Sequence, residues 1–113
     1  NTFKVITKAG VTSADVIYTV AGSTTTIILG LMIGNTTSGA ITSSVTLGTD
    51  TANRAGANNE TNQDVELITS AAIPANSSLE FMGGNKIIME TTDTLTVTGS
   101  AAVDIALSVM EIT

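Results

Sequence analysis

Residues 24–35, T-T-T-I-I-L-G-L-M-I-G-N, contain a long apolar run. β-branched residues and two glycines disfavour a helix here, and the run is too short to cross a bilayer. It is typical of a central strand, whose side chains alternate between two faces. Strict alternation puts Ile27, Leu29, Leu31 and Ile33 on one face and Ile28, Gly30, Met32 and Gly34 on the other. We expect the first face to pack on a core and the second, thinned by glycine, to let another surface come close.

The composition limits the possible classes of function. A chain of 113 residues is expected to form one domain, residues 1–113. The formal net charge of −6 opposes binding to nucleic acid or to an anionic membrane surface, and the four basic residues are scattered. Without cysteine there is neither a disulfide framework nor a thiolate metal site. No signal peptide and no apolar span of about 20 residues is expected.

Short alternating segments separated by turn residues continue along the whole chain. We expect the segment 15–20, with Val16, Tyr18 and Val20 on one face, to form a hairpin with the strand at 24–35. Near the end, Ile112 falls on the face of Met110, which suggests a bulge or a change of pairing partner there. The other expected strands are residues 2–8, 40–47, 64–69, 78–82, 86–90, 94–98 and 103–112. In the first of these we expect Phe3, Val5 and Thr7 to point inward, and in the last two we expect Leu95 and Val97, and Leu107 and Val109, to share the core face. The pattern predicts an all-β fold: a single antiparallel β-sandwich of about eight strands, jelly-roll or Ig-like.

Chemistry-bearing residues are sparse. The chain has no histidine, so Ser-His-Asp and Cys-His arrangements are excluded, and we predict no catalytic residue and no cofactor. The carboxylates Glu60, Asp64 and Glu66 cluster in sequence, but a glycosidase pair is disfavoured because few aromatic residues are present for sugar stacking. The loop 48–63 offers oxygen ligands yet fails the EF-hand pattern. We predict no metal ligand, and calcium binding by this loop stays an open alternative.

With the strands placed, four segments together resemble the small β-sandwich virion proteins of tailed bacteriophages. They are V-I-Y-T-V-A-G-S-T-T-T-I-I-L-G-L at 16–31, I-P-A-N-S-S at 73–78, G-N-K-I at 84–87 and A-L-S-V-M-E-I-T at 106–113. The resemblance implies a non-enzymatic structural protein located in the virion. It further implies a capsid decoration or cement protein on the outer surface of the phage head. The expected partners are the major capsid protein, other virion proteins and further copies of this chain, with a trimer as the expected homo-oligomer.

Two segments are the expected protein–protein contacts, because each leaves backbone polar groups available to another chain. One is the N-terminal segment around Phe3, and the other is the loop 48–63 with Arg54, Asn58 and Asn59. Two alternatives stay open at this point. The chain could be a neck, tail or fibre-associated phage module, or a carbohydrate-binding or adhesin domain, which would need an exposed aromatic platform.

Overall fold

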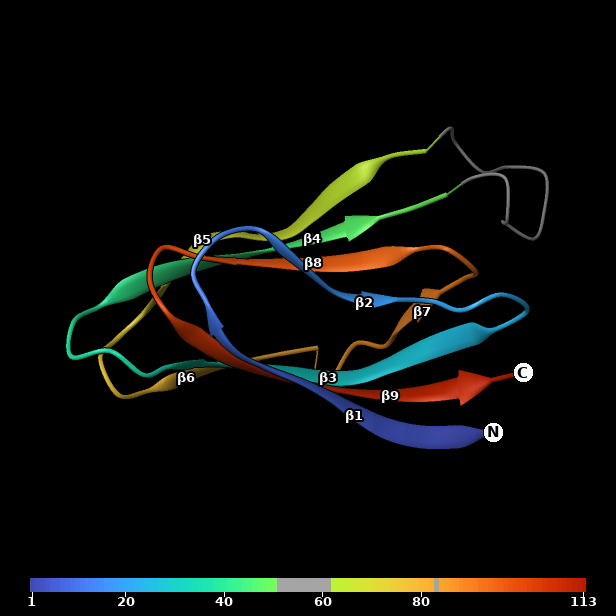
Figure 1. Ribbon diagram of the computed structural model, residues 1–113, viewed down its shortest axis with the longest axis horizontal. Helices are drawn as coiled ribbons and strands as arrows, with labels where there is room; N and C mark the ends of the chain where they lie inside the picture. Colours follow the sequence, from blue (N-terminus) through green and yellow to red (C-terminus); the bar gives the residue numbers. More distant parts are fainter. Residues whose placement is uncertain (51–61, 83) are drawn as a thin grey trace.

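The chain folds as two antiparallel β-sheets packed face to face (Figure 1). The computed structural model describes residues 1–50, 62–82 and 84–113, and these residues include no helix. The strands are β1 (Thr2–Val11), β2 (Asp15–Thr19), β3 (Thr25–Asn35), β4 (Ile41–Gly48), β5 (Asp64–Ile73), β6 (Ser78–Phe81), β7 (Ile87–Met89), β8 (Thr94–Gly99) and β9 (Val103–Ile112). The predicted all-β sandwich is confirmed.

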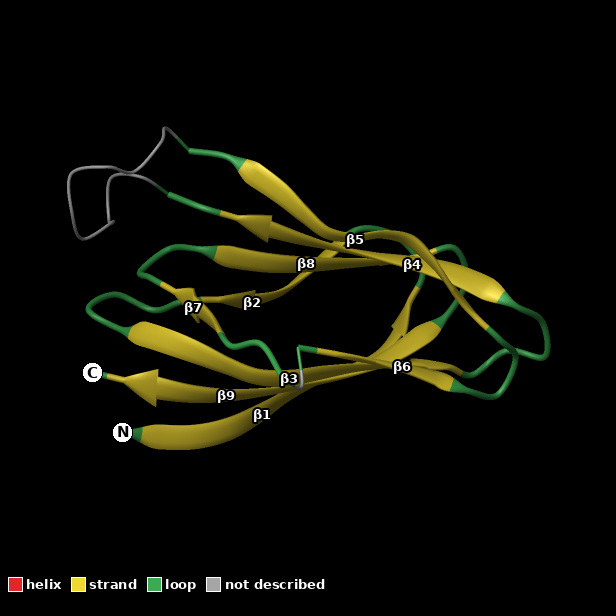
Figure 2. Cartoon of the chain, turned by 180° about the vertical axis from the view of Figure 1, so that it is seen from behind, coloured by secondary structure: helices red, strands yellow, loops and turns green. Residues whose placement is uncertain are grey.

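The strand order identifies the type of sandwich. One sheet has the order β1-β9-β3-β6, with β7 also paired to β3, and the other has the order β2-β8-β4-β5. β6 and β7 follow one another along the same edge of β3, because β9 occupies its other edge. Most connections pass from one sheet to the other, as Figure 2 shows. This order is that of a jelly roll, and it differs from the Ig-like alternative.

The predicted hairpin between residues 15–20 and 24–35 is wrong. β2 pairs with β8, whereas β3 pairs with β9, β6 and β7 in the opposite sheet. The connection between β2 and β3 carries the chain across the gap of about 10 Å that separates packed sheets. A short connection containing glycine suits a hairpin or a crossing equally well, so the sequence pattern does not distinguish them.

The core lies between the two sheets and is built from alternate residues of the central strands. Its fully buried side chains include Ile28 and Ile33 of β3, Leu95 and Val97 of β8, and Leu107 and Val109 of β9. The register places Leu31 opposite Leu107 and Ile33 opposite Ile105. Burying such aliphatic side chains contributes about 1.5–3 kcal/mol each before conformational entropy is counted.

A β-bulge at Leu29 corrects the expected faces of β3. Ile28 pairs with Val109 and Gly30 pairs with Ser108, which leaves Leu29 as an extra residue between two ladder positions. One extra residue reverses the alternation. The core therefore takes Ile28 from before the bulge, and Ile27 faces outward, opposite to the prediction. The predicted pattern holds only after the bulge, where Leu31 and Ile33 face inward and Gly30, Met32 and Gly34 face outward.

Three further expectations about strands need correction. In β2 the register shifts between Val16 and Tyr18, so Val16 is exposed while Tyr18 and Val20 are buried. β5 extends to Ile73 instead of ending at residue 69; Ser70, with a φ of 49°, marks an irregularity that the strand passes through. Neither a bulge nor a change of pairing partner occurs near the end of β9, because β9 stays paired with β3 up to Ile112 and Glu111 occupies a regular inward position.

Candidate functional site

The outer face of the five-stranded sheet carries a row of apolar side chains across four strands. Residues directly opposite one another in antiparallel strands point to the same face. Because Val109 and Met89 are buried, their neighbours Met110 and Ile88 point outward. The register then aligns Ile88 with Ile27, Ile27 with Met110, and Met110 with Phe3. We call these four residues the apolar row; its two ends are the most exposed, with Ile88 58% and Phe3 71% accessible to solvent.

The same face is hollowed next to the apolar row. One hollow of about 250 Å³ is lined by Gly30, Leu31, Met32, Glu80, Phe81, Ala106 and Ser108. A second, of about 200 Å³, shares Met32 and Ala106 and continues past Gly34. Glycine and alanine at these outward positions leave the sheet backbone open to close approach. The prediction that the glycine-thinned face of residues 24–35 admits another surface agrees with these hollows for Gly30, Met32 and Gly34.

The outer face of the four-stranded sheet has a different chemistry. In β8 the buried Leu95 and Val97 alternate with threonines, and in β4 the inward Ser43 and Val45 do the same. Hydroxyl side chains therefore line the two central strands of this face: Thr42, Ser44 and Thr46 of β4, and Thr94, Thr96 and Thr98 of β8. Exposed Val16 of β2 and Glu66 of β5 lie beside them on the flanking strands. Register aligns Thr46 with Thr96 and Ser44 with Thr98. The sandwich thus has one apolar, hollowed face and one face whose central strands are lined with hydroxyl groups.

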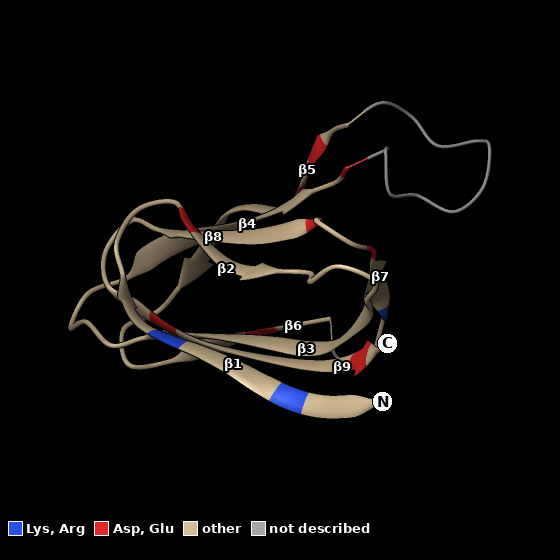
Figure 3. Cartoon of the chain, turned by 45° about the vertical axis from the view of Figure 1, so that its right-hand side comes forward, with Lys and Arg blue, Asp and Glu red and all other residues tan. Residues whose placement is uncertain are grey.

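Charges are few on the apolar side. Of the described strand residues that point outward from the five-stranded sheet, only Glu80 and Asp104 are charged, and both lie away from the apolar row. Figure 3 shows how thinly charged residues are spread over the strands. A surface of this kind loses little solvation free energy when it is covered, because few charges must be desolvated.

β1 forms one edge of the five-stranded sheet. Residues 2–8 pair regularly with β9, and the ladder becomes irregular only between Lys8 and Val11. Both lysines of this strand are bound within the chain: Lys4 Nζ lies 3.1 Å from Glu111 Oε1, and Lys8 Nζ lies 3.0 Å from Asp15 Oδ2. Phe3 and Val5 point outward and are largely exposed, which corrects the expectation that they point inward; their partners in β9 are the outward Met110 and Ser108. The predicted contact residue Phe3 therefore lies at a sheet edge and at one end of the apolar row.

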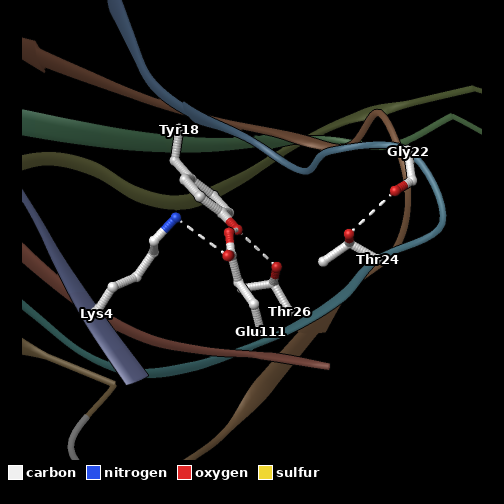
Figure 4. Close-up of polar contacts among 6 residues, drawn as sticks. All are labelled: Lys4, Tyr18, Gly22, Thr24, Thr26 and Glu111. Carbon is white, nitrogen blue, oxygen red and sulfur yellow. Dashed lines mark hydrogen bonds and ion pairs between the residues drawn. The ribbon is translucent and has the colours of Figure 1, made fainter. Parts of the chain in front are cut away.

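A polar cluster links the two sheets at the end of the sandwich where both chain termini lie (Figures 1 and 4). Tyr18 of β2 donates a hydrogen bond of 2.6 Å from its Oη to Glu111 Oε2 of β9. Tyr18 Oη also lies 2.7 Å from the hydroxyl oxygen of Thr26 in β3. Because the proton of Tyr18 is donated to Glu111, the hydroxyl of Thr26 donates to Tyr18 Oη. Lys4 completes the cluster through Glu111. The cluster therefore ties β2 of one sheet to β1, β3 and β9 of the other.

The cluster fixes the protonation states of its members. Burial and, next, the hydrogen bond to Glu111 raise the pKa of Tyr18 to about 12. The hydrogen bond from Tyr18 and then the one from Lys4 lower the pKa of Glu111. A neutral phenol and an ionised carboxylate are the forms that this hydrogen bond requires, so the arrangement is a cross-sheet tie. Sequence reasoning missed it, although the single tyrosine at a predicted inward position and Glu111 within an alternating strand were its available signals.

Other candidate residues are separated. Glu66 accepts hydrogen bonds from the hydroxyls of Thr46 and Thr69, while Asp64 lies beside Gly48. Within residues 1–50, 62–82 and 84–113, no three acidic residues are grouped closely enough to hold a metal ion. Glu60 and the predicted contact residues Arg54, Asn58 and Asn59 lie outside the described residues.

The described ends of the loop 48–63 are held together. Thr49 N donates to the carbonyl oxygen of Gln63 at 2.8 Å, and Asp50 N donates to Asp93 Oδ1 at 2.9 Å. Asp93 is fully buried, and its other carboxylate oxygen accepts a hydrogen bond from Glu90 N. The loop therefore leaves and re-enters the sandwich at a fixed point.

No protein-family model matches the chain, and neither a curated protein nor a solved structure does so. Among the described residues, no helix has the length and apolar character needed to cross a membrane.

Proposed function

We propose that this protein is a non-enzymatic structural component of a tailed-phage virion, a decoration or cement protein on the outer surface of the head. The observation that carries the proposal is the contrast between the two faces of the sandwich. The five-stranded sheet presents the apolar row and its hollows, and the four-stranded sheet presents hydroxyl groups. A decoration protein needs one face that docks on the shell and one that stays hydrated, and the contrast between the two faces of this chain supports that role.

The apolar face is the docking face in this proposal, and the major capsid protein is the partner. Exposed apolar patches bounded by polar residues are a common mark of protein–protein contact. Met32 lies between the two hollows, so a side chain or loop of the shell that enters them would contact it. The jelly-roll fold is compatible with this role, because it occurs in capsid proteins as well as in lectins, but fold alone does not assign function.

The first measurement is the copy number of this polypeptide in purified particles, by quantitative mass spectrometry against the major shell protein. Copies comparable in number to the shell protein support decoration of the lattice. A handful to a few dozen copies would instead indicate the neck, tail or fibre-associated alternative. Absence from particles contradicts the virion role and favours the carbohydrate-binding or adhesin alternative.

The docking face is tested with charge substitutions at positions that tolerate them. Ile88→Lys and Met32→Lys each place a charge on the apolar face, and Val16→Lys, at a residue of similar exposure in β2, is the matched control. Co-sedimentation with undecorated heads should weaken about tenfold or more for the first two, a loss of at least about 1.4 kcal/mol. The control should bind like the unmodified protein. Equal binding by all three would contradict docking through this face.

A further inference from the structure

None of the described strands pairs with the outer edge of β1, and this edge has only part of the usual protection of an edge strand. Natural edge strands are protected by charged side chains, including inward-pointing ones, and by prolines, bulges or short length. Over residues 2–8 β1 is regular and free of proline, and its lysines are both held by carboxylates of the same chain. Lys4 and Lys8 also point to the inner side of the sheet, since their partners in β9 are the buried Val109 and Ile105.

The outward side chains of this edge are uncharged. Phe3 and Val5 are 71% and 60% accessible, and Thr7 is exposed as well. An unpaired strand edge offers backbone donors and acceptors to a further strand, and exposed apolar side chains beside it add burial when that strand arrives. Because the two inward lysines are paired with carboxylates of the same chain, residues 2–8 keep a regular edge that another β-strand can pair with.

We propose that β1 pairs antiparallel with β1 of a second copy of this chain, about a twofold axis at Val5. The axis joins the two five-stranded sheets edge to edge and brings their apolar rows onto one continuous face. An isologous contact of this kind is self-complementary, because each pair of residues occurs twice. This inference goes beyond the virion role and does not depend on it, and it proposes a dimer in place of the trimer that the resemblance implies.

Charge selects the register. Residues opposite one another in an antiparallel pair share a face, so an outward residue of one copy must lie opposite an outward residue of the other. This holds only if the twofold axis passes through a residue, which then lies opposite its own copy. An axis at Lys4 would put the two copies of Lys4 opposite each other, and an axis at Ile6 would put Lys4 opposite Lys8. Like charges directly opposite are destabilising. An axis at Val5 avoids both clashes.

The Val5 axis also gives the longest overlap. It pairs Phe3 with Thr7, Lys4 with Ile6 and Thr2 with Lys8, and so uses all of residues 2–8, where the β1 ladder is regular. An axis at Phe3 shortens the overlap at the start of the strand, and an axis at Thr7 runs into the irregularity after Lys8. An edge of seven residues falls below the area of a standard interface, so the dimer should be weak, with a dissociation constant of roughly 10 μM to 1 mM.

Disulfide trapping tests the register residue by residue, because the chain has no native cysteine. Directly opposed residues in an antiparallel pair have Cα atoms roughly 4.5–5.5 Å apart, within disulfide range. Val5→Cys alone should cross-link into a dimer under mild oxidation. Phe3→Cys and Thr7→Cys should each stay uncross-linked alone and should link to each other when mixed.

Charge exchange gives a second, reversible test by sedimentation velocity across the expected concentration range. Val5→Lys and Val5→Glu should each abolish dimer formation, because like charges then meet at the axis. Mixing the two variants in equal amounts should restore a heterodimer. Val16→Lys, on β2, should dimerise like the unmodified chain, and circular dichroism should show that every variant is folded.

The proposal fails on any of several results. A chain that stays monomeric up to about 1 mM would overturn it, and so would a trimer or larger assembly. Association that survives Val5→Lys would overturn the edge, and self-cross-linking of Phe3→Cys would overturn the Val5 axis. A monomer that still attaches to phage heads would refute the dimer and leave the proposed function standing, so the two are tested separately.

Discussion

Replacing Tyr18 by phenylalanine should remove the cross-sheet tie without changing the shape of the core. The substitution deletes only the Oη atom, which is bonded to Glu111 at 2.6 Å and to Thr26 at 2.7 Å. A hydrogen bond to a charged group contributes about 1.5–3 kcal/mol, and a buried hydroxyl left without a partner costs about 1–3 kcal/mol. Thr26 is fully buried. We therefore expect Tyr18→Phe to lower the free energy of unfolding at neutral pH by about 3 kcal/mol.

The same cluster makes stability depend on pH at both ends. The pKa of Tyr18 is raised from 10.0 to about 12, so its contribution is complete below pH 10 and is lost as the pH rises towards 12. A shift of about two units corresponds to about 3 kcal/mol. The pKa of Glu111 is lowered, so its contribution is present above its unfolded value near 4.5 and disappears as the pH falls through the folded value. Tyr18→Phe should remove the alkaline part, and Glu111→Gln the acidic part.

Urea unfolding followed by circular dichroism measures these changes. Tyr18 is the only tyrosine and tryptophan is absent, so the ultraviolet absorbance of tyrosinate reports this residue alone. In the double variant Tyr18→Phe, Thr26→Val the loss should be less than additive, because no hydroxyl is left unpaired. A tyrosinate midpoint near 10 in the folded protein, or a loss below about 1 kcal/mol in Tyr18→Phe, would refute the reasoning.

Three other changes test the turns and bulges. Asn35 is buried, and its Nδ2 donates to the carbonyl oxygens of Gly39, Ile73 and Pro74. Asn35→Ala should therefore lower the free energy of unfolding, measured in urea, by about 3 kcal/mol, and a loss under about 1 kcal/mol would contradict this role. A Cβ on Gly99 would lie 2.5 Å from the carbonyl oxygen of Ala101, so Gly99→Ala should destabilise the fold by about 2 kcal/mol or more. A Cβ on Gly30 would have nothing within 4 Å, so Gly30→Ala should change the stability by no more than about 0.5 kcal/mol. Equal shifts of the thermal midpoint for the two variants would contradict this contrast. Deleting Leu29 removes the bulge and keeps every other side chain of β3 on its face. The variant should therefore still unfold cooperatively in urea, with a loss of at most about 2 kcal/mol in the free energy of unfolding. A variant that unfolds without cooperativity would contradict the bulge.

The sequence was sufficient to predict strands where alternation is strict and uninterrupted. β8 and β9 follow this rule, with Leu95, Val97, Leu107 and Val109 inward, and their expected faces are confirmed. The strands β2 and β3 were also predicted, but their predicted faces are wrong where one residue is inserted, at Leu29 in β3 and between Val16 and Tyr18 in β2. A bulge has no strong local signal, because the cost of the extra residue is offset by pairing partners that lie far along the chain.

The candidate site likewise has some features that follow from the local sequence pattern and others that depend on pairing between distant strands. The open, glycine-thinned part of residues 24–35 follows from local pattern. The exposed position of Phe3 does not, because alternation along residues 2–8 predicts that Phe3 points inward. The apolar row does not, because Ile88 and Met110 are neighbours of Ile27 only through the register of β7 and β9 on β3. The assignment of β2 and β3 to opposite sheets was equally hidden, since a hairpin turn and a crossing use the same residues.

The bulge at Leu29 connects the fold to the proposed docking face. Strict alternation from Leu31 back along the strand would direct Ile27 into the core and Ile28 to the surface. With the extra residue, Ile28 fills the core opposite Val109, and Ile27 stands outward between Ile88 and Met110. The apolar row is continuous across the sheet only because Ile27 is turned outward. A single inserted residue therefore completes the core and the exposed row together, and variants of that row should weaken attachment while leaving the core intact.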